Sequence, residues 1–330
     1  MKPFALQRPE SVADAAALLP DAHGRETVLL AGGQDLLTEW KQAVVAPDTV
    51  VDLKRIPDLD RLEAGPQGGL EIGALVTVAQ LAEHAGVAAH HAVLSEAAAQ
   101  VGSPQIREAG TVGGNLNQRP RCWYYRDAAS PCLKKGGTTC YAQLGRNKYN
   151  AILGGGPSYI VHPSDLATAL VALDAEVTLV SPRGERRLRL EDYYVLPGDG
   201  DVTRETVREP DEVLTRVHVP QPEAGLRSTY LKFRERGSYD WALSAVALGV
   251  WTAPDGTISK ARLVLGGVAP TPWRCQSTEE LLVGRRLDEE TLRLAGQDAL
   301  RRAEPLSDNA YKVPLTKGLL VRAAQQLTRD

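Results

Sequence analysis

The sequence predicts an α+β protein with at least two domains, on three observations. The chain has 330 residues, which is enough for two or three domains with cores of their own. Strand-like apolar runs and helix-like segments both occur along it. Its composition changes after Pro220-Gln221-Pro222, which indicates a domain boundary. We expect the last third, beyond this boundary, to be a small α+β domain.

Charge and hydropathy exclude two classes of protein. The formal net charge is -3 and no basic stripe stands out, so a nucleic-acid-binding protein is not expected. No apolar run approaches the roughly 18–20 residues that a membrane-spanning helix needs. The first ten residues contain neither an apolar signal core nor a twin arginine, so we expect no export signal in this chain.

Local signals give the elements before the boundary. Ser11 begins a capping box ahead of an Ala/Leu helix that should end near Pro20. We expect Asp35 to cap a helix over 36–40, and Ser164 or Asp165 to cap another over 165–172. The remaining segment, 181–225, should consist of Pro-broken loops around one strand. Strands are expected at 27–30 (buried), 49–53, 70–72, 175–180 and 215–219, and further helices at 77–85 and 92–101.

The segments after the boundary contain fewer local signals. Apolar runs at 230–233 and 244–251 fit either strands or helices. The Asp255-Gly256 pair predicts a hairpin turn before a strand over 258–264. Helices are expected at 277–284, 288–303 and 314–328.

Two glycine turns are candidates for binding one diphosphate. The first, Ala31–Leu37, follows a strand, and the second is Thr111-Val112-Gly113-Gly114-Asn115. Glycine lets the backbone turn sharply and brings amide groups close to a ligand. The alternative is that both are ordinary turns. A second Gly-Gly pair in the same domain favours a shared, extended diphosphate ligand.

A loop rich in Gly, Pro and Arg carries three of the four cysteines. Cys122, Cys132 and Cys140 fall within 19 residues, in the segment 117–158 that has too many breakers for long regular structure. Nine and seven residues separate them, unlike the spacing of zinc ribbons or bacterial ferredoxins, but compatible with a loop around a cluster. The alternative is three buried or incidental thiols.

Together these motifs resemble a known family. The stretches that carry the resemblance are A-G-G-Q-D-L-L from residue 31, G-T-V-G-G-N from 110, H-P-S-D-L-A from 162, Y-L-K-F-R from 230 and G-G-V-A-P-T-P-W-R from 266. In this order they resemble the FAD-binding medium subunit of the molybdenum hydroxylases, along nearly the whole chain. The cysteine loop is similar to that of the [4Fe–4S]-containing subtype in bacterial three-subunit aldehyde oxidoreductase and 4-hydroxybenzoyl-CoA reductase.

The resemblance implies a fold and a set of FAD contacts. The fold is a FAD-binding domain of the vanillyl-alcohol-oxidase (PCMH) type over 1–222, with lobes of about 1–55 and 56–222, and then a CO-dehydrogenase-flavoprotein-like domain over 226–330. Lys232 is placed near the isoalloxazine, although by itself it reads as a solvated strand lysine. The other implied contacts are Leu30, Ala31, Gly32, Gly33, Gln34, Asp35, Leu36, Leu37, Thr111, Gly113, Gly114, Asn115, Asp165 and Val217.

The resemblance also implies an iron–sulfur site, with one departure. Three ligands would be Cys122, Cys132 and Cys140, and the fourth position falls on Ser158, a serine where the subtype has cysteine. Cys275 lies in the other domain and matches no ligand position. Three outcomes follow: ligation by the serine alkoxide, a water-ligated or [3Fe–4S] cluster, or no cluster. An oxygen ligand weakens binding of soft cluster iron.

The implied function is electron transfer within a complex. A molybdenum-cofactor large subunit would oxidise an aldehyde or N-heterocycle, and a [2Fe–2S] small subunit would pass electrons to FAD here and on to an external acceptor. We expect the cytoplasm, or the periplasm if a partner carries a twin-arginine signal. The rivals are a stand-alone flavoenzyme and a scaffold with zinc on the three cysteines and His162. The aromatics at 123–125 should pack over cofactor or in the core.

Overall fold

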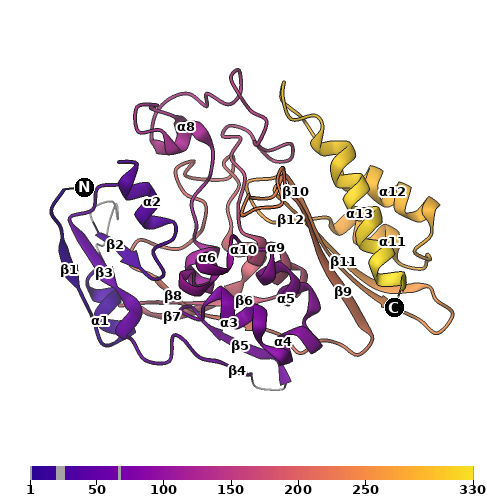
Figure 1. Cartoon of the computed structure of the whole chain (residues 1–330), viewed down its shortest axis with the longest axis horizontal. Helices are drawn as coiled ribbons and strands as arrows, with labels where there is room; N and C mark the ends of the chain where they lie inside the picture. Colours follow the sequence, from indigo (N-terminus) through magenta and orange to yellow (C-terminus); the bar gives the residue numbers. More distant parts are fainter. Residues whose placement is uncertain (1, 20–26, 66–67, 330) are drawn as a thin grey trace.

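The computed structural model describes residues 2–19, 27–65 and 68–329, and it builds them into three sheets with helices packed against them (Figure 1). The strand orders are β1-β3-β2, β4-β5-β8-β6-β7 and β12-β11-β10-β9. The predicted α+β class is confirmed. Pro20, where the first helix was expected to end, lies outside the described residues.

The first lobe is a small parallel sheet formed by β1 (Ala5–Gln7), β3 (Thr49–Asp52) and β2 (Thr27–Leu30). Helix α1 (Val12–Ala17) begins at Ser11, whose hydroxyl accepts from the Asp14 amide as predicted. Helix α2 (Leu36–Lys41) follows the first glycine turn. Strand β2 is half-buried, so the prediction of a buried strand was wrong. The reason is that it lies at the edge of a sheet of three strands.

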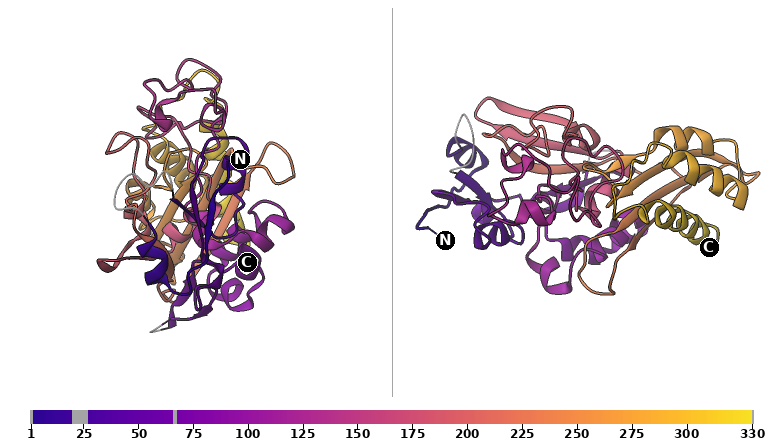
Figure 2. Two further views of the ribbon diagram at one scale, coloured as in Figure 1. Left: turned by 90° about the vertical axis from the view of Figure 1, so that its left-hand side faces the viewer. Right: turned by 90° about the horizontal axis from the view of Figure 1, so that it is seen from above.

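The second lobe is an antiparallel sheet with helices on it, and Figure 2 shows it between the other two parts. The strands are β4 (Leu62–Ala64), β5 (Leu70–Gly73), β8 (Val213–Val219), β6 (Glu176–Ser181) and β7 (Gly184–Arg189). The helices are α3 (Val78–Glu83), α4 (Ala85–His90), α5 (Ala92–Ala99), α6 (Pro104–Ala109), α7 (Val112–Leu116), α9 (Asp165–Ala172) and α10 (Leu190–Tyr193).

Strand β7 corrects the prediction that 181–225 contains a single strand. It pairs along its whole length with β6, and α10 follows it directly. Its residues G-E-R-R-L-R are mostly exposed on both faces, because β7 is an edge strand with little packed against it. Without an apolar face, the segment had no strand period to detect.

The last third confirms the predicted small α+β domain. Both undecided apolar runs are strands, β9 (Leu226–Phe233) and β10 (Ser244–Thr252). The predicted Asp255-Gly256 hairpin joins β10 to β11 (Ile258–Gly266), with Gly256 at a φ of 82°. Short β12 (Trp273–Arg274) completes the sheet. Helices α11 (Gln276–Leu282), α12 (Glu289–Ala299) and α13 (Lys312–Arg329) gather on one side of it (Figure 1).

Helix α9 joins the parts through a shared core. It is buried along its whole length and contacts α5 and α7 as well as β10 and β11. The largest apolar cluster therefore contains Leu166 and Leu170 together with Tyr230, Ala245 and Val264 from the last third. The division at residues 222 and 226 stays a prediction.

The segment 117–158 is irregular, as predicted, and the last third of the chain holds it in place. It contains only α8 (Trp123–Arg126) and a single 3₁₀ turn, Leu133–Lys135, among its described residues. The buried ammonium of Lys312 donates to the carbonyls of Tyr149, Asn150 and Gly267. We call residues 117–158 the cysteine loop below.

Candidate cofactor cavity and thiol pocket

A cavity of about 1050 Å³ runs between the two glycine turns and reaches β9. Its size suits a dinucleotide, because pockets for smaller ligands begin at roughly 300 Å³. Most of the predicted contacts line it: Ala31, Gly32, Gly33, Gln34, Asp35, Leu36, Thr111, Gly113, Gly114, Asn115, Asp165 and Lys232. Leu30, Leu37 and Val217 do not; the Val217 side chain is fully buried in the core instead.

The two turns meet because glycine allows backbone to touch backbone. A Cβ on Gly32 would lie 2.8 Å from the Ala109 carbonyl carbon and nearer still to its oxygen. A Cβ on Gly113 would lie 2.9 Å from the Ala74 carbonyl oxygen. Both turns line the same cavity, and the single diphosphate that they were predicted to share stays a prediction.

The second turn is a short helix rather than an open turn. Its residues form α7, which begins at Thr111, whose hydroxyl accepts from the Gly114 amide at 3.2 Å. The amides of Val112 and Gly113 donate to Val76 and Ala74 of the second lobe, each at 2.8 Å. Since sequence patterns cannot distinguish a capped five-residue helix from a turn, the tertiary bonds decided its conformation.

Asp35 does not cap α2, contrary to the prediction. Its carboxylate makes no cap hydrogen bond and turns instead to the cysteine loop. It accepts from the Arg119 amide at 2.5 Å and lies 2.8 Å from Arg121 and 2.7 Å from Arg126. Two guanidinium groups and an amide satisfy this largely buried anion better than one helical amide would.

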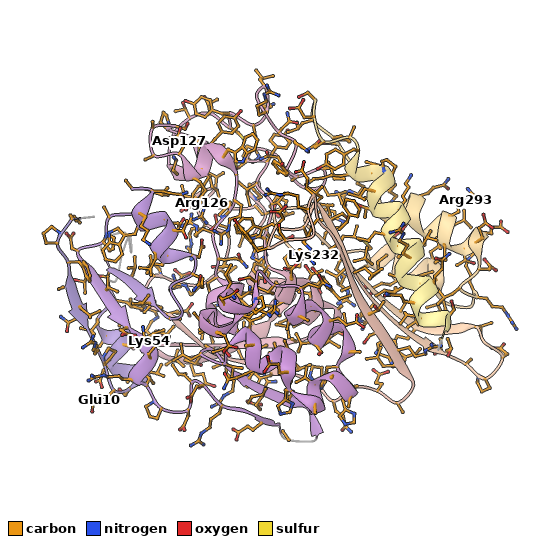
Figure 3. The ribbon with its side chains drawn as sticks, in the orientation of Figure 1. Glu10, Lys54, Arg126, Asp127, Lys232 and Arg293 are labelled. Carbon is orange, nitrogen blue, oxygen red and sulfur yellow. The ribbon has the colours of Figure 1, made fainter. Side chains whose placement is uncertain are left out.

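At the β9 end of the cavity Lys232 forms a buried ion pair with Asp165 and is not the solvated lysine that the sequence alone suggested. The Lys232 side chain is 1% exposed. Its ammonium lies 2.8 Å from the Asp165 carboxylate and donates to the Gln100 carbonyl at 3.1 Å. Tyr230 donates to Asp165 at 2.5 Å, and burial raises the pKa of that phenol well above its usual range. Figure 3 marks Lys232 near the middle of the molecule.

Of the two residues predicted to cap α9, Ser164 does so and Asp165 does not.

The four predicted cluster ligands border a single small pocket. Cys122, Cys132, Cys140 and Ser158 line a space of about 10 Å³, room for roughly one water molecule. Cys132 and Ser158 are buried, and burial raises the pKa of the Cys132 thiol. Within the described residues no three His, Cys, Asp or Glu side chains are spaced to hold a metal ion. Three thiols and a hydroxyl are chemically able to ligate cluster iron. Their spacing and the volume of the pocket, however, do not fit a cluster.

His162 plays no part in this thiol pocket. Its ring packs edge-on against Tyr194 with centroids 4.4 Å apart and does not border the thiols. Burial lowers the pKa of His162 to about 4, so the imidazole is neutral at pH 7. The structure thus gives no support to zinc on three cysteines and His162.

Tyr125 and Lys134 border both the cavity and the thiol pocket. Sequence reasoning considered Tyr125 only as a packing aromatic and missed Lys134, because a lysine beside a cysteine carries no motif. Lys134 is 2% exposed and lies 3.0 Å from Glu205. Arg119, Arg121 and the segment 201–206 also line the cavity without any sequence signal. Of the neighbouring aromatics, Trp123 is 58% exposed and so is not a core residue.

Comparison with known proteins identifies the class of protein to which this cavity belongs. The sequence profile of the FAD binding domain in molybdopterin dehydrogenase matches residues 2–222, so the protein is a FAD-binding flavoprotein. The profile of the CO dehydrogenase flavoprotein C-terminal domain matches residues 228–327.

Individual relatives agree with the profiles. The chain is 36% identical to the aldehyde oxidoreductase FAD-binding subunit PaoB of Escherichia coli, covering 97% of this chain and 96% of that one. It is 30% identical to the nicotinate dehydrogenase FAD-subunit of Eubacterium barkeri, covering 88% and 83%. CO dehydrogenase of Oligotropha carboxidovorans aligns with a TM-score of 0.78 and 27% identity, covering 99% and 98%. The chain belongs to the FAD-binding medium subunits of the molybdenum hydroxylases, a family of oxidoreductase subunits.

We predict that Gly32→Ala abolishes FAD retention. The added methyl would push against the Ala109 carbonyl, which is backbone and cannot rotate away, at a cost of about 1–3 kcal/mol in unfolding free energy. FAD content after purification and urea unfolding measure both effects. Gly318→Ala in α13 is the control, since a Cβ there meets nothing within 4 Å. Full FAD retention in Gly32→Ala would contradict the close approach of the two turns.

We predict that His162 makes the protein sensitive to mild acid. Its pKa is about 6.5 in the unfolded chain and about 4 when folded, so only the unfolded chain binds this proton between these values. The free energy of unfolding should fall as pH drops through this window, by about 2 kcal/mol between pH 7 and pH 5. His162→Phe should remove this part of the fall. Urea titrations at the two pH values test it, and equal losses in both proteins would refute it.

Proposed function

We propose that the protein is the electron-transfer flavoprotein of a complex with a molybdenum-cofactor large subunit and a [2Fe–2S] small subunit. The observation that carries the proposal is the single cavity that both glycine turns share with the Lys232–Asp165 pair. FAD, when bound, would accept electrons from the partners and pass them to an external acceptor. The relatives' names support an aldehyde or N-heterocycle as the organic substrate of the complex.

The chain's own residues would bind and orient the FAD. Backbone amides of Ala31–Leu36 would bind the diphosphate. The second turn, Thr111–Asn115, would contact it mainly through other atoms, because four of its five amides already donate within the protein. Strand β8 would contact another part of the cofactor at Leu214, which lines the cavity. Lys232 would lie near the flavin ring, where a positive charge stabilises the reduced form. Asp165 and Tyr230 would hold the ammonium in place.

The lining of the cavity favours this reading over a stand-alone flavoenzyme. A stand-alone enzyme needs a base near the flavin, yet the described lining residues include no histidine, and the Asp165 carboxylate is already engaged by Lys232 and Tyr230. None of the helices in residues 2–19, 27–65 and 68–329 is both long and apolar enough to cross a bilayer. We propose the cytoplasm as the compartment, or the periplasm for a complex exported by a partner's twin-arginine signal.

Purification of the tagged chain from its native host tests the proposal. We expect two further subunits, molybdenum and a [2Fe–2S] signal to copurify, and an added aldehyde or N-heterocycle to bleach the flavin band near 450 nm under anaerobic conditions. A chain that purifies alone, with a flavin that small molecules reduce directly, would favour the stand-alone flavoenzyme.

We predict opposite shifts of the flavin potential on removing the two buried charges. Lys232→Met should lower the midpoint potential, because it removes a positive charge beside the reduced flavin, and Asp165→Asn should raise it. Lys232→Met also leaves the Asp165 carboxylate unpaired, which should cost about 3–5 kcal/mol of stability. Potentiometric titration measures the shifts, with Lys232→Arg as the charge-preserving control. Shifts of the same sign in both variants would exclude a direct electrostatic role.

We further propose that the thiol pocket takes an iron–sulfur cluster through Cys122, Cys132 and Cys140, with Ser158 at the fourth position. The support is that these four side chains border one space, and that the cysteine loop resembles that of the [4Fe–4S]-containing subtype. The cluster would supply a further one-electron site. The cysteine loop would have to open to admit it, because the pocket holds roughly one water molecule.

We predict that Ser158→Cys raises the iron and sulfide content of anaerobically purified protein. The fourth thiolate is a softer ligand than a serine oxygen and should complete the set. Cys275→Ser is the control, since Cys275 is buried in the last third of the chain and does not border the pocket. Less than one iron per chain in both the wild type and Ser158→Cys would refute the cluster proposal without affecting the proposal that the protein binds FAD.

A further inference from the structure

Helix α2 turns two carboxylates toward the cysteine loop. Asp35 and Glu39 are one helical turn apart and so share a face. The side chain of Asp35 is 15% exposed and that of Glu39 is 5% exposed. Burial raises the pKa of Glu39. A carboxylate removed from solvent requires charged or hydrogen-bonding partners. The partners of these two carboxylates identify the segment that α2 holds in place.

The partners lie on both sides of Cys122 in the sequence. Asp35 contacts Arg121 at 2.8 Å and Arg126 at 2.7 Å. Tyr125 donates to Glu39 at 2.7 Å. Arg126 also donates to the carbonyls of Arg119 and Pro120, which fixes the turn that leads into Cys122. Figure 3 marks Arg126 at the base of the part that carries α8. Helix α2 therefore holds the residues on either side of Cys122 in place.

The same helix begins at the cofactor cavity. Gln34, Asp35 and Leu36 line the cavity at the end of the first glycine turn. Cys122 does not line the cavity, so bound FAD would not cover it directly. Tyr125 and Lys134 separate the two spaces and belong to the lining of both.

We propose that Asp35 is a positioning residue that couples FAD binding to the order of the thiol pocket. FAD bound to the first glycine turn fixes the start of α2, and the Asp35 carboxylate carries this constraint through Arg121 and Arg126 to the backbone on either side of Cys122. The coupling uses buried charge pairs, which resist separation because each partner alone would be left unpaired. It depends on FAD binding and is independent of whether a cluster is assembled.

The reactivity of Cys122 tests the coupling. The full chain, freed of iron by a chelator, is treated with iodoacetamide with and without saturating FAD, and mass spectrometry follows each cysteine. We expect FAD to slow alkylation of Cys122 by about fivefold or more, the lower end of typical coupling between sites. Cys275 is the internal reference, because it is buried and burial raises the pKa of its thiol. Equal Cys122 rates with and without FAD would overturn the proposal.

Matched variants at Arg126 test whether the coupling between FAD and Cys122 passes through the Asp35–Arg126 ion pair. Arg126→Met should bind FAD yet lose most of the protection of Cys122, whereas Arg126→Lys, which keeps the charge, should retain part of it. Undiminished protection in Arg126→Met would overturn the role of Asp35. If Arg126→Met does not fold, Arg126→Gln, which keeps hydrogen-bond donors but removes the charge, takes its place and should likewise lose most of the protection. FAD binding is measured separately by quenching of flavin fluorescence; its absence in the wild type would refute the proposed function, whereas binding without protection would refute only this coupling.

Discussion

The structure depends on one close approach, that of Gly32 to the backbone at Ala109 and Gly110. Only a residue without a side chain allows the first lobe to bring its turn against the second lobe at this distance. The cofactor cavity exists because of this contact, since it places residues of both glycine turns around one space. The sheets on either side serve to hold the two turns in this position.

Buried charges organise the surroundings of the cavity. Lys232 with Asp165 lies at one end, and Asp35 with Arg121 and Arg126 lies where the cysteine loop begins. Such pairs add little net stability compared with apolar packing, but breaking one is costly. They therefore suit a protein that must hold a cofactor ring and a reactive loop in fixed relation to each other.

The sequence predicted elements well where local chemistry decides them. The Ser11 cap, the Asp255-Gly256 hairpin and the helix over 314–328 were all confirmed, because caps, turns and apolar periods act over a few residues. It failed at β7 and at Asp35 for the opposite reason. An edge strand lacks an apolar period, and the partners of the Asp35 carboxylate lie more than eighty residues away in the chain.

The sequence by itself determined the family, the two glycine turns and the identity of the thiols with Ser158 beside them, because these are properties of residue type and order. The tertiary structure alone decided that Lys232 is buried against Asp165, that Asp35 faces the cysteine loop, and that Tyr125 and Lys134 stand between the two spaces. The physical reason is that the side-chain partner of a buried charge is set by packing between distant segments, which no local pattern records.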